Sequence, residues 1–160
     1  MKISVEVYDK TGKIALDVLA KEPGVVRKFI VYFPADDQMI IGIGPKFLEE
    51  EEGYLHHRLA TWMGIEEDTI CRSMKRKTET GRRIEGGGFM TFTETESKYH
   101  KGGKFRSVTF YGSSGDYSSP SSLLCSNDTV RKIIAEMGAN SVSIEFKMQV
   151  FDAGDGGLRF

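Results

Sequence analysis

The chain has 160 residues, 39% of them hydrophobic and 28% charged, and its 22 basic and 23 acidic residues leave a formal net charge of −1. Such a chain suits one soluble globular domain. The charge balance argues against a dedicated binder of nucleic acid or acidic membranes, which relies on long-range attraction, and no apolar run reaches the roughly 18 residues of a membrane span.

The N-terminal part of the chain is predicted to form strands followed by a helix. Alternating apolar residues, or runs of β-branched and aromatic residues, predict strands at residues 3–7, 14–19, 25–33 and 40–43. The apolar spacing becomes helical between Pro45 and Met63. Because Gly53 interrupts this stretch, the helix is expected to start near Tyr54, and Gly64 is expected to stop it.

The C-terminal part is predicted to form further strands around one short helix. Strands are predicted at residues 69–74, 89–93, 105–111 and 142–150. Residues 112–122 are rich in glycine, serine and proline and are expected to form a loop. Asn127 or Asp128 is expected to cap the short helix, and Gly138 to end it. Residues 152–160 are expected to be a frayed tail.

These elements do not alternate regularly between strand and helix, which favours an α+β fold. We expect a single mixed β-sheet of about five or six strands with two helices packed on it, in one domain over residues 1–160. Ordinary surface charge and the lack of a heptad pattern favour a monomer.

The cysteines and histidines favour a reducing compartment and no metal site. Cys71 and Cys125 lie far apart and form no CxxC pair, and the three histidines lack metal-type spacing. The N-terminus lacks the uninterrupted apolar block of a secretory signal. We therefore expect a cytoplasmic protein with unpaired thiols, no metal and no cofactor.

Two segments have the composition of anion-binding loops. Gly86-Gly87-Gly88 precedes a strand, and glycines let successive backbone N–H groups converge on an anion, although a turn or bulge is the commoner use of such a run. Residues 112–119 combine small residues and hydroxyls, as in a phosphate-binding loop or an ordinary serine-rich surface loop. They lack the lysine of a P-loop.

Several ionisable side chains are candidates for phosphate chemistry. His56 and His57 lie in the predicted helix, where a histidine can act as general base or nucleophile, although exposed helical histidines would explain the pair as well. Lys28 lies inside the strongest strand, where it must face solvent or an anion. Basic residues also gather between Arg72 and Arg83, either to hold an acidic partner or to face solvent.

Taken in order along the chain, these pieces resemble the protein histidine phosphatase (Janus/Ocnus) family. The resemblance runs from about Val25 to Phe146. It consists of the lysine-led strand Lys28-Phe29-Ile30-Val31, Tyr54-Leu55-His56-His57 leading into a helix, Gly86-Gly87-Gly88-Phe89, and Tyr111-Gly112-Ser113-Ser114-Gly115-Asp116-Tyr117-Ser118. The last motif is the most specific, because its Tyr, Gly, Ser and Tyr keep the family's spacing.

The resemblance implies a phosphatase that uses no metal. It implies that His56 acts as general base or nucleophile in removing phosphate from phosphohistidine, with His57 as the fallback. A lysine would neutralise the phosphate, glycine amides would donate to it, and a serine with a nearby aspartate amide would complete the cradle. These phosphate-binding roles fall on Lys28, Gly87, Gly88, Ser114 and Asp116.

Two positions depart from the family's pattern. The family usually has a basic residue just after its triple glycine, where this chain has Phe89, so that Arg82 or Arg83 would have to supply the charge. Asp116 stands where the family has a small neutral residue, and a carboxylate facing a phosphate repels it by roughly 1–4 kcal/mol in a partly wet site. Both changes point to altered substrate choice or to a lost activity.

Three functional hypotheses follow. The first is a metal-independent phosphatase acting on phosphohistidine in a protein or on a small phosphoramidate. The second is a non-catalytic protein on the same fold that binds a phosphorylated or acidic partner, and the departures at Phe89 and Asp116 favour it. The third and plainest is an α+β domain unrelated to that family.

Overall fold

The computed structural model describes residues 1–46, 56–74, 82–96, 103–112, 114–145, 150–152 and 157–159. The strands among these residues are β1 (Lys2–Asp9), β2 (Gly12–Ile14), β3 (Arg27–Ala35), β4 (Gln38–Lys46), β5 (Arg83–Glu96), β6 (Lys104–Tyr111), β7 (Ser141–Glu145), β8 (Val150–Asp152) and β9 (Gly157–Arg159). The helices are α1 (Val18–Lys21), α2 (His56–Trp62), α3 (Glu67–Met74), α4 (Ser121–Leu124) and α5 (Asn127–Met137).

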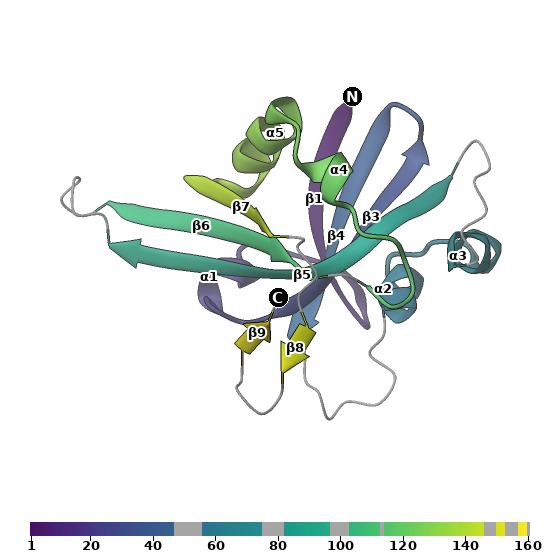
Figure 1. Cartoon of the computed structure of the whole chain (residues 1–160), viewed down its shortest axis with the longest axis horizontal. Coiled ribbons are helices and arrows are strands. Elements are labelled where there is room, and N and C mark those ends of the chain that lie inside the picture. The colour runs from purple at the N-terminus through teal and green to yellow at the C-terminus, as the bar shows by residue number, and fades with distance from the viewer. Residues whose placement is uncertain are drawn as a thin grey trace.

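Seven of the described strands form one mixed sheet, in the order β2-β1-β4-β3-β5-β6-β7 (Figure 1). The pairs β1–β4 and β6–β7 are parallel, and the other neighbours are antiparallel. The α+β class and the mixed sheet are therefore confirmed. The expectation of five or six strands and two helices is wrong. β2, α1 and α4 are only three or four residues long and give no readable period, and α3 was predicted as a strand.

Helices cover both faces of this sheet. Successive side chains of a strand point to opposite faces, and β3 shows this clearly. Phe29, Val31 and Phe33 lie in a buried core that includes residues of α1, α4 and α5. Ile30 and Tyr32 lie in a second cluster with residues of α2 and α3. The face covered by α2 and α3 carries the candidate site.

Residues 69–74, predicted to be a strand, lie instead in helix α3. Glu67 and Asp68 occupy its first turn, where negative charge suits the helix dipole. Ile70 is buried in the cluster that α3 shares with α2. A run of six residues that includes the β-branched Thr69 and Ile70 does not distinguish a strand period from a helix period, which explains the error.

The triple glycine lies inside β5 and not in a turn before it. Gly86, Gly87 and Gly88 all pair with residues of β3. Glycine usually weakens a strand, but here other groups need the space above the backbone. A Cβ added at Gly86, for example, would lie 2.8 Å from the Cβ of Pro120.

Other predicted boundaries shift. The strand predicted over residues 14–19 gives way to α1, which begins at Val18. The final strand predicted over residues 142–150 is described as β7 and β8. Within the tail predicted over residues 152–160, the described residues 157–159 form β9, which pairs antiparallel with β8.

Some predicted features lie outside the described residues. They are the helix start near Tyr54, Ser113 of the serine-rich loop, residues 146–149 of the final strand, and Lys75, Arg76 and Lys77 of the basic cluster.

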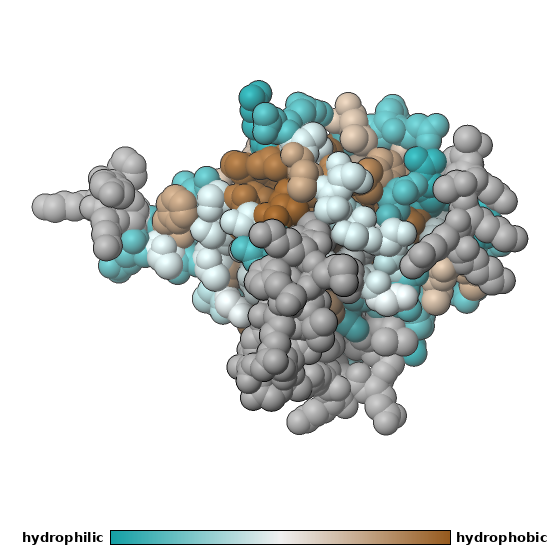
Figure 2. Space-filling model, viewed as in Figure 1, coloured by the Kyte–Doolittle hydropathy of each residue, from teal (hydrophilic) through white to brown (hydrophobic). Residues whose placement is uncertain are grey.

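The surface is mixed in character. In Figure 2 hydrophobic residues gather where β7 and α5 lie in the view of Figure 1. Val142 and Ile144 of β7 are half-buried and pack against the core.

Cys71 and Cys125 are exposed and are not joined to each other. Within the described part of the chain, no helix is both long and apolar enough to cross a membrane.

Helix α5 has Ser126 as its N-cap, in place of the predicted Asn127 or Asp128. The Ser126 backbone is extended, and its Oγ accepts the N–H of Thr129 at 3.1 Å. Gly138, with φ 60°, ends the helix as predicted.

Replacing Ser126 with alanine is expected to lower the free energy of unfolding by about 1 kcal/mol, because the Thr129 N–H loses its acceptor. Asn127→Ala is the matched control, since Asn127 lies one residue further on and is not the cap. It should change the free energy of unfolding by less than about 0.5 kcal/mol. Urea denaturation of both variants measures the difference, and equal losses would contradict the cap assignment.

Candidate functional site

The predicted site residues come from four separate elements. Lys28 lies on β3, Gly87 and Gly88 on β5, His56 and His57 at the start of α2, and Ser114 and Asp116 in the loop after β6. Hydrogen bonds and strand pairing link these elements on the side of the sheet that α2 covers. The fold therefore brings residues of all four elements together.

His56 is buried, with 5% of its surface exposed. Its Nε2 lies 2.8 Å from the carbonyl oxygen of Gly88. Because a carbonyl can only accept a hydrogen bond, Nε2 carries the proton, and in the neutral ring Nδ1 then holds the lone pair. Burial is the main cause that lowers the pKa of His56 to about 4, and the charge of Lys28 lowers it further. His56 is thus a neutral imidazole of fixed tautomer at physiological pH.

Gly87 lies directly against the His56 ring. A Cβ at Gly87 would be 3.1 Å from His56 Cδ2, from the Phe29 carbonyl oxygen and from Ser114 Cβ. The Gly87 N–H donates to the Ser118 carbonyl at 3.1 Å, and its carbonyl accepts the Ser114 N–H at 3.1 Å. Gly87 therefore provides space for the histidine and holds the serine-rich loop, and its N–H is engaged within the chain.

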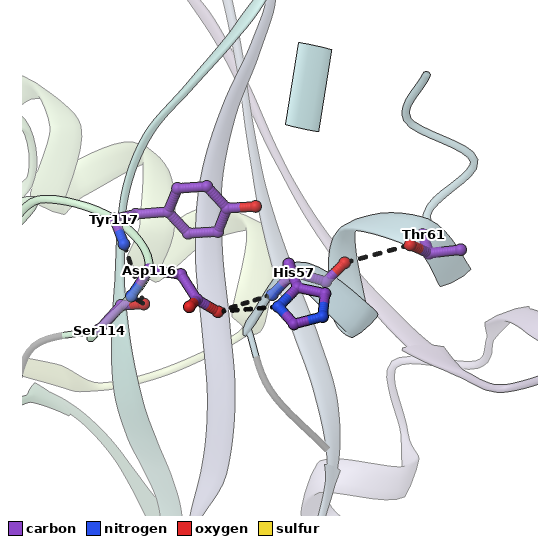
Figure 3. A network of polar contacts seen from close by, with 5 residues as sticks. All are labelled: His57, Thr61, Ser114, Asp116 and Tyr117. Carbon is purple, nitrogen blue, oxygen red and sulfur yellow. Dashed lines mark hydrogen bonds and ion pairs between the residues drawn. The ribbon is translucent and has the colours of Figure 1, made fainter. Parts of the chain in front are cut away.

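The loop of Ser114 and Asp116 is closed by its own hydrogen bonds. Ser114 Oγ accepts the N–H of Asp116 at 3.0 Å and the N–H of Tyr117 at 3.2 Å. The amide expected to complete a phosphate cradle thus already has an acceptor inside the loop. The turn has a second consequence, because it aims the Asp116 side chain toward α2 (Figure 3).

The Asp116 carboxylate holds His57 at two atoms. Its Oδ2 accepts the backbone N–H of His57 at 3.1 Å and lies 3.3 Å from the His57 Nδ1 (Figure 3). The side chain of Asp116 is 19% exposed, and that of His57 is 35% exposed. The carboxylate therefore lies at the start of α2, next to both histidines, and does not extend into solvent.

Lys28 is the buried cation of the site. It is 5% exposed and lies opposite Phe89 of β5 in the sheet. Burial lowers the pKa of the Lys28 ammonium, and the negative charge of Asp116 partly opposes that effect. The Lys28 and Asp116 charges also act in opposite directions on the His56 pKa. Lys28 and Asp116 thus act as opposite charges on the one buried imidazole.

Phe89 gives the site an aromatic wall, which the sequence interpretation missed. Its ring packs edge-to-face on His56, with centroids 5.4 Å apart, and stacks on Tyr111 at 6.2 Å. Phe89 and Tyr111 are direct neighbours in the β5–β6 pairing. Phe89 also pairs with Lys28, so all three side chains lie on one face of the sheet, but alternation within a single strand does not reveal this pairing register.

The two arginines considered as substitutes for the missing basic residue have other partners. Arg82 pairs with Glu66 at 3.3 Å. Arg83 lies 3.7 Å from Asp36 and contacts Glu85. Both guanidinium groups pair with other carboxylates, and Lys28 is the cation whose charge acts on the His56 pKa.

The described residues contain no group of three or more His, Cys, Asp and Glu side chains that could hold a metal ion. No protein-family model, curated protein or solved structure matches this chain. The function proposed next therefore rests on side-chain geometry and on the motif resemblance.

Proposed function

We propose that the protein is a metal-independent phosphatase that removes phosphate from phosphohistidine or a related phosphoramidate, with His56 as general base or nucleophile. One observation carries the proposal: the Gly88 carbonyl fixes the His56 ring so that Nδ1 holds the lone pair. Histidines on the surface of a helix have no such constraint. The buried Lys28 beside this ring supplies a positive charge for a phosphoryl group.

The chemistry requires a P–O bond to form and a P–N bond to break. As general base, His56 Nδ1 takes a proton from water while the water oxygen bonds to phosphorus. The electron pair of the P–N bond leaves with the nitrogen, which takes up a proton. As nucleophile, Nδ1 bonds to phosphorus directly, and water later releases phosphate from the ring. P–N bonds are labile, so a positioned imidazole and one buried cation supply the groups that this reaction needs.

The test is phosphate release from a phosphohistidine peptide and from phosphoramidate, with EDTA present, comparing the wild type with His56→Gln and His57→Gln. Glutamine at position 56 keeps an N–H donor for the Gly88 carbonyl but has no lone pair on nitrogen. We expect kcat/KM to fall by about 10²- to 10⁴-fold in His56→Gln. In His57→Gln the backbone contact to Asp116 is kept, and we expect a smaller loss.

Each alternative result is informative. Loss of activity in His57→Gln alone would move the base to the histidine that Asp116 holds. No release from either substrate by the wild type would refute hydrolysis.

A second candidate is a non-catalytic binding protein on the same fold. The engaged N–H groups of Gly87 and Asp116 favour it, because they leave fewer donors for a transferred phosphate. This function predicts that a phosphohistidine peptide binds without turnover and that binding survives in His56→Gln.

A further inference from the structure

Asp116 holds a carboxylate against the start of α2, where the two candidate histidines lie. Its carboxylate accepts the backbone N–H of His57 and lies beside the His57 ring, with its charge acting on Lys28 and on His56. A bound phosphoryl group would need the same cation and the same neighbourhood. The site therefore already contains one fixed negative charge before any substrate enters.

Asp116 cannot easily turn away from this position. The Ser114 Oγ binds the N–H groups of both Asp116 and Tyr117, which fixes the backbone on either side of the Asp116 side chain. Tyr117 is itself buried at 3% exposure and lies in the cluster beneath α2 and α3. The carboxylate is thus held in place by a closed turn and a buried anchor.

We propose that Asp116 is a specificity-determining residue that makes the site select P–N phosphoryl substrates over phosphate esters and free phosphate. This inference rests on the proposed function and names the substrate class of that site. A fixed carboxylate repels the anionic phosphoryl group of phosphate esters, free phosphate and phosphoramidates alike, so the selection rests on the leaving atom. The leaving nitrogen of a phosphoramidate takes up a proton, so the same carboxylate favours it, whereas the leaving oxygen of an ester carries no positive charge.

The competing explanation is that Asp116 only anchors the start of α2. Asp116→Asn separates the two roles, because the asparagine oxygen still accepts the His57 N–H but the charge is gone. Asp68→Asn is the matched control: it removes one negative charge from the exposed face of α3, where Asp68 pairs with Arg72. Both variants change the net charge equally, and only one changes the site.

The first measurement is binding of inorganic phosphate at pH 8 by calorimetry. We expect Asp116→Asn to bind phosphate at least tenfold more tightly than the wild type, which corresponds to about 1.4 kcal/mol, and Asp68→Asn to be unchanged. The ratio of kcat/KM for p-nitrophenyl phosphate to that for phosphoramidate should rise at least tenfold in Asp116→Asn alone. Unchanged phosphate affinity in a folded Asp116→Asn would overturn the inference.

A second measurement needs no variant and so does not depend on Asp116→Asn folding. Sulfamate is a singly charged analogue with a nitrogen, and sulfate is a doubly charged analogue without one. The wild type should bind sulfamate at least tenfold more tightly than sulfate, and equal or reversed affinities would overturn the inference. The wild type could hydrolyse neither substrate and still prefer sulfamate to sulfate, with phosphate binding more tightly to Asp116→Asn. That result would support the effect of the Asp116 charge on anion binding and would refute hydrolysis. Hydrolysis without any preference between sulfamate and sulfate would support the proposed phosphatase activity and would refute the proposed role of Asp116 in specificity.

Discussion

Replacing Gly87 with alanine should cost the protein both stability and the proposed catalytic geometry. The added Cβ would lie 3.1 Å from three atoms at once, and one of them is the backbone oxygen of Phe29, which belongs to the central sheet. The His56 ring and Ser114 must therefore move instead. We expect a loss of about 1–3 kcal/mol in the free energy of unfolding, which is typical of overpacking.

The same substitution is expected to lower kcat/KM by up to about 10-fold, because relieving contacts of 3.1 Å moves the His56 ring by less than the ångström displacement that costs about 10²-fold. Thermal unfolding and phosphate release, measured on the same preparation, give both quantities. Gly86→Ala is the first control: its Cβ would collide with Pro120 and with the Ser118 carbonyl at 2.8 Å but not with His56. It should lose stability and keep more activity per folded molecule.

Gly115→Ala is the second control, since no atom lies within 4 Å of the position of its added Cβ. It lies in the same loop as Ser114 and should leave both stability and activity nearly unchanged. Full activity in a folded Gly87→Ala would contradict the close placement of His56 over β5.

Strands with a clear pattern of apolar residues were predictable, because that pattern follows directly from which side chains are buried. Ile3, Val5 and Val7 of β1 lie in the main buried core, and the β-branched and aromatic run of β3 is divided between that core and the second cluster. The triple glycine was not predictable as part of a strand. Its presence in β5 depends on His56 and Pro120, which are distant in sequence and need the space that a side chain would fill.

In the candidate site, too, some features could be predicted from the sequence and others depend on tertiary contacts. The expectation that His56, Lys28, Ser114 and the glycines share one site comes from the motif resemblance and not from the residues themselves. The direction of the Asp116 side chain could not be predicted, because it depends on a contact between residues 57 and 116, which are 59 positions apart. Sequence raised the question of whether that carboxylate faces the site, and only the tertiary arrangement answers it.

Acidification is expected to destabilise the protein through His56. The folded-state pKa of His56 is about 4, whereas an unperturbed histidine has a pKa of about 6.5. Between these two values the unfolded chain binds a proton that the folded chain does not. Stability is therefore unaffected by this group above about pH 6.5 and is progressively lost as the pH falls to 4, by about 3 kcal/mol in total.

His56→Gln isolates this contribution, because glutamine does not titrate and can still donate to the Gly88 carbonyl. Carboxylates that titrate in the same range are common to both proteins and cancel in the comparison. Urea denaturation at pH 7.5, 6, 5 and 4 should show that the wild type loses about 3 kcal/mol more than His56→Gln across this range. Parallel losses in the two proteins would mean that His56 accepts a proton in the folded state near its ordinary pKa. The neutral ring, on which the proposed role of Nδ1 depends, would then be wrong.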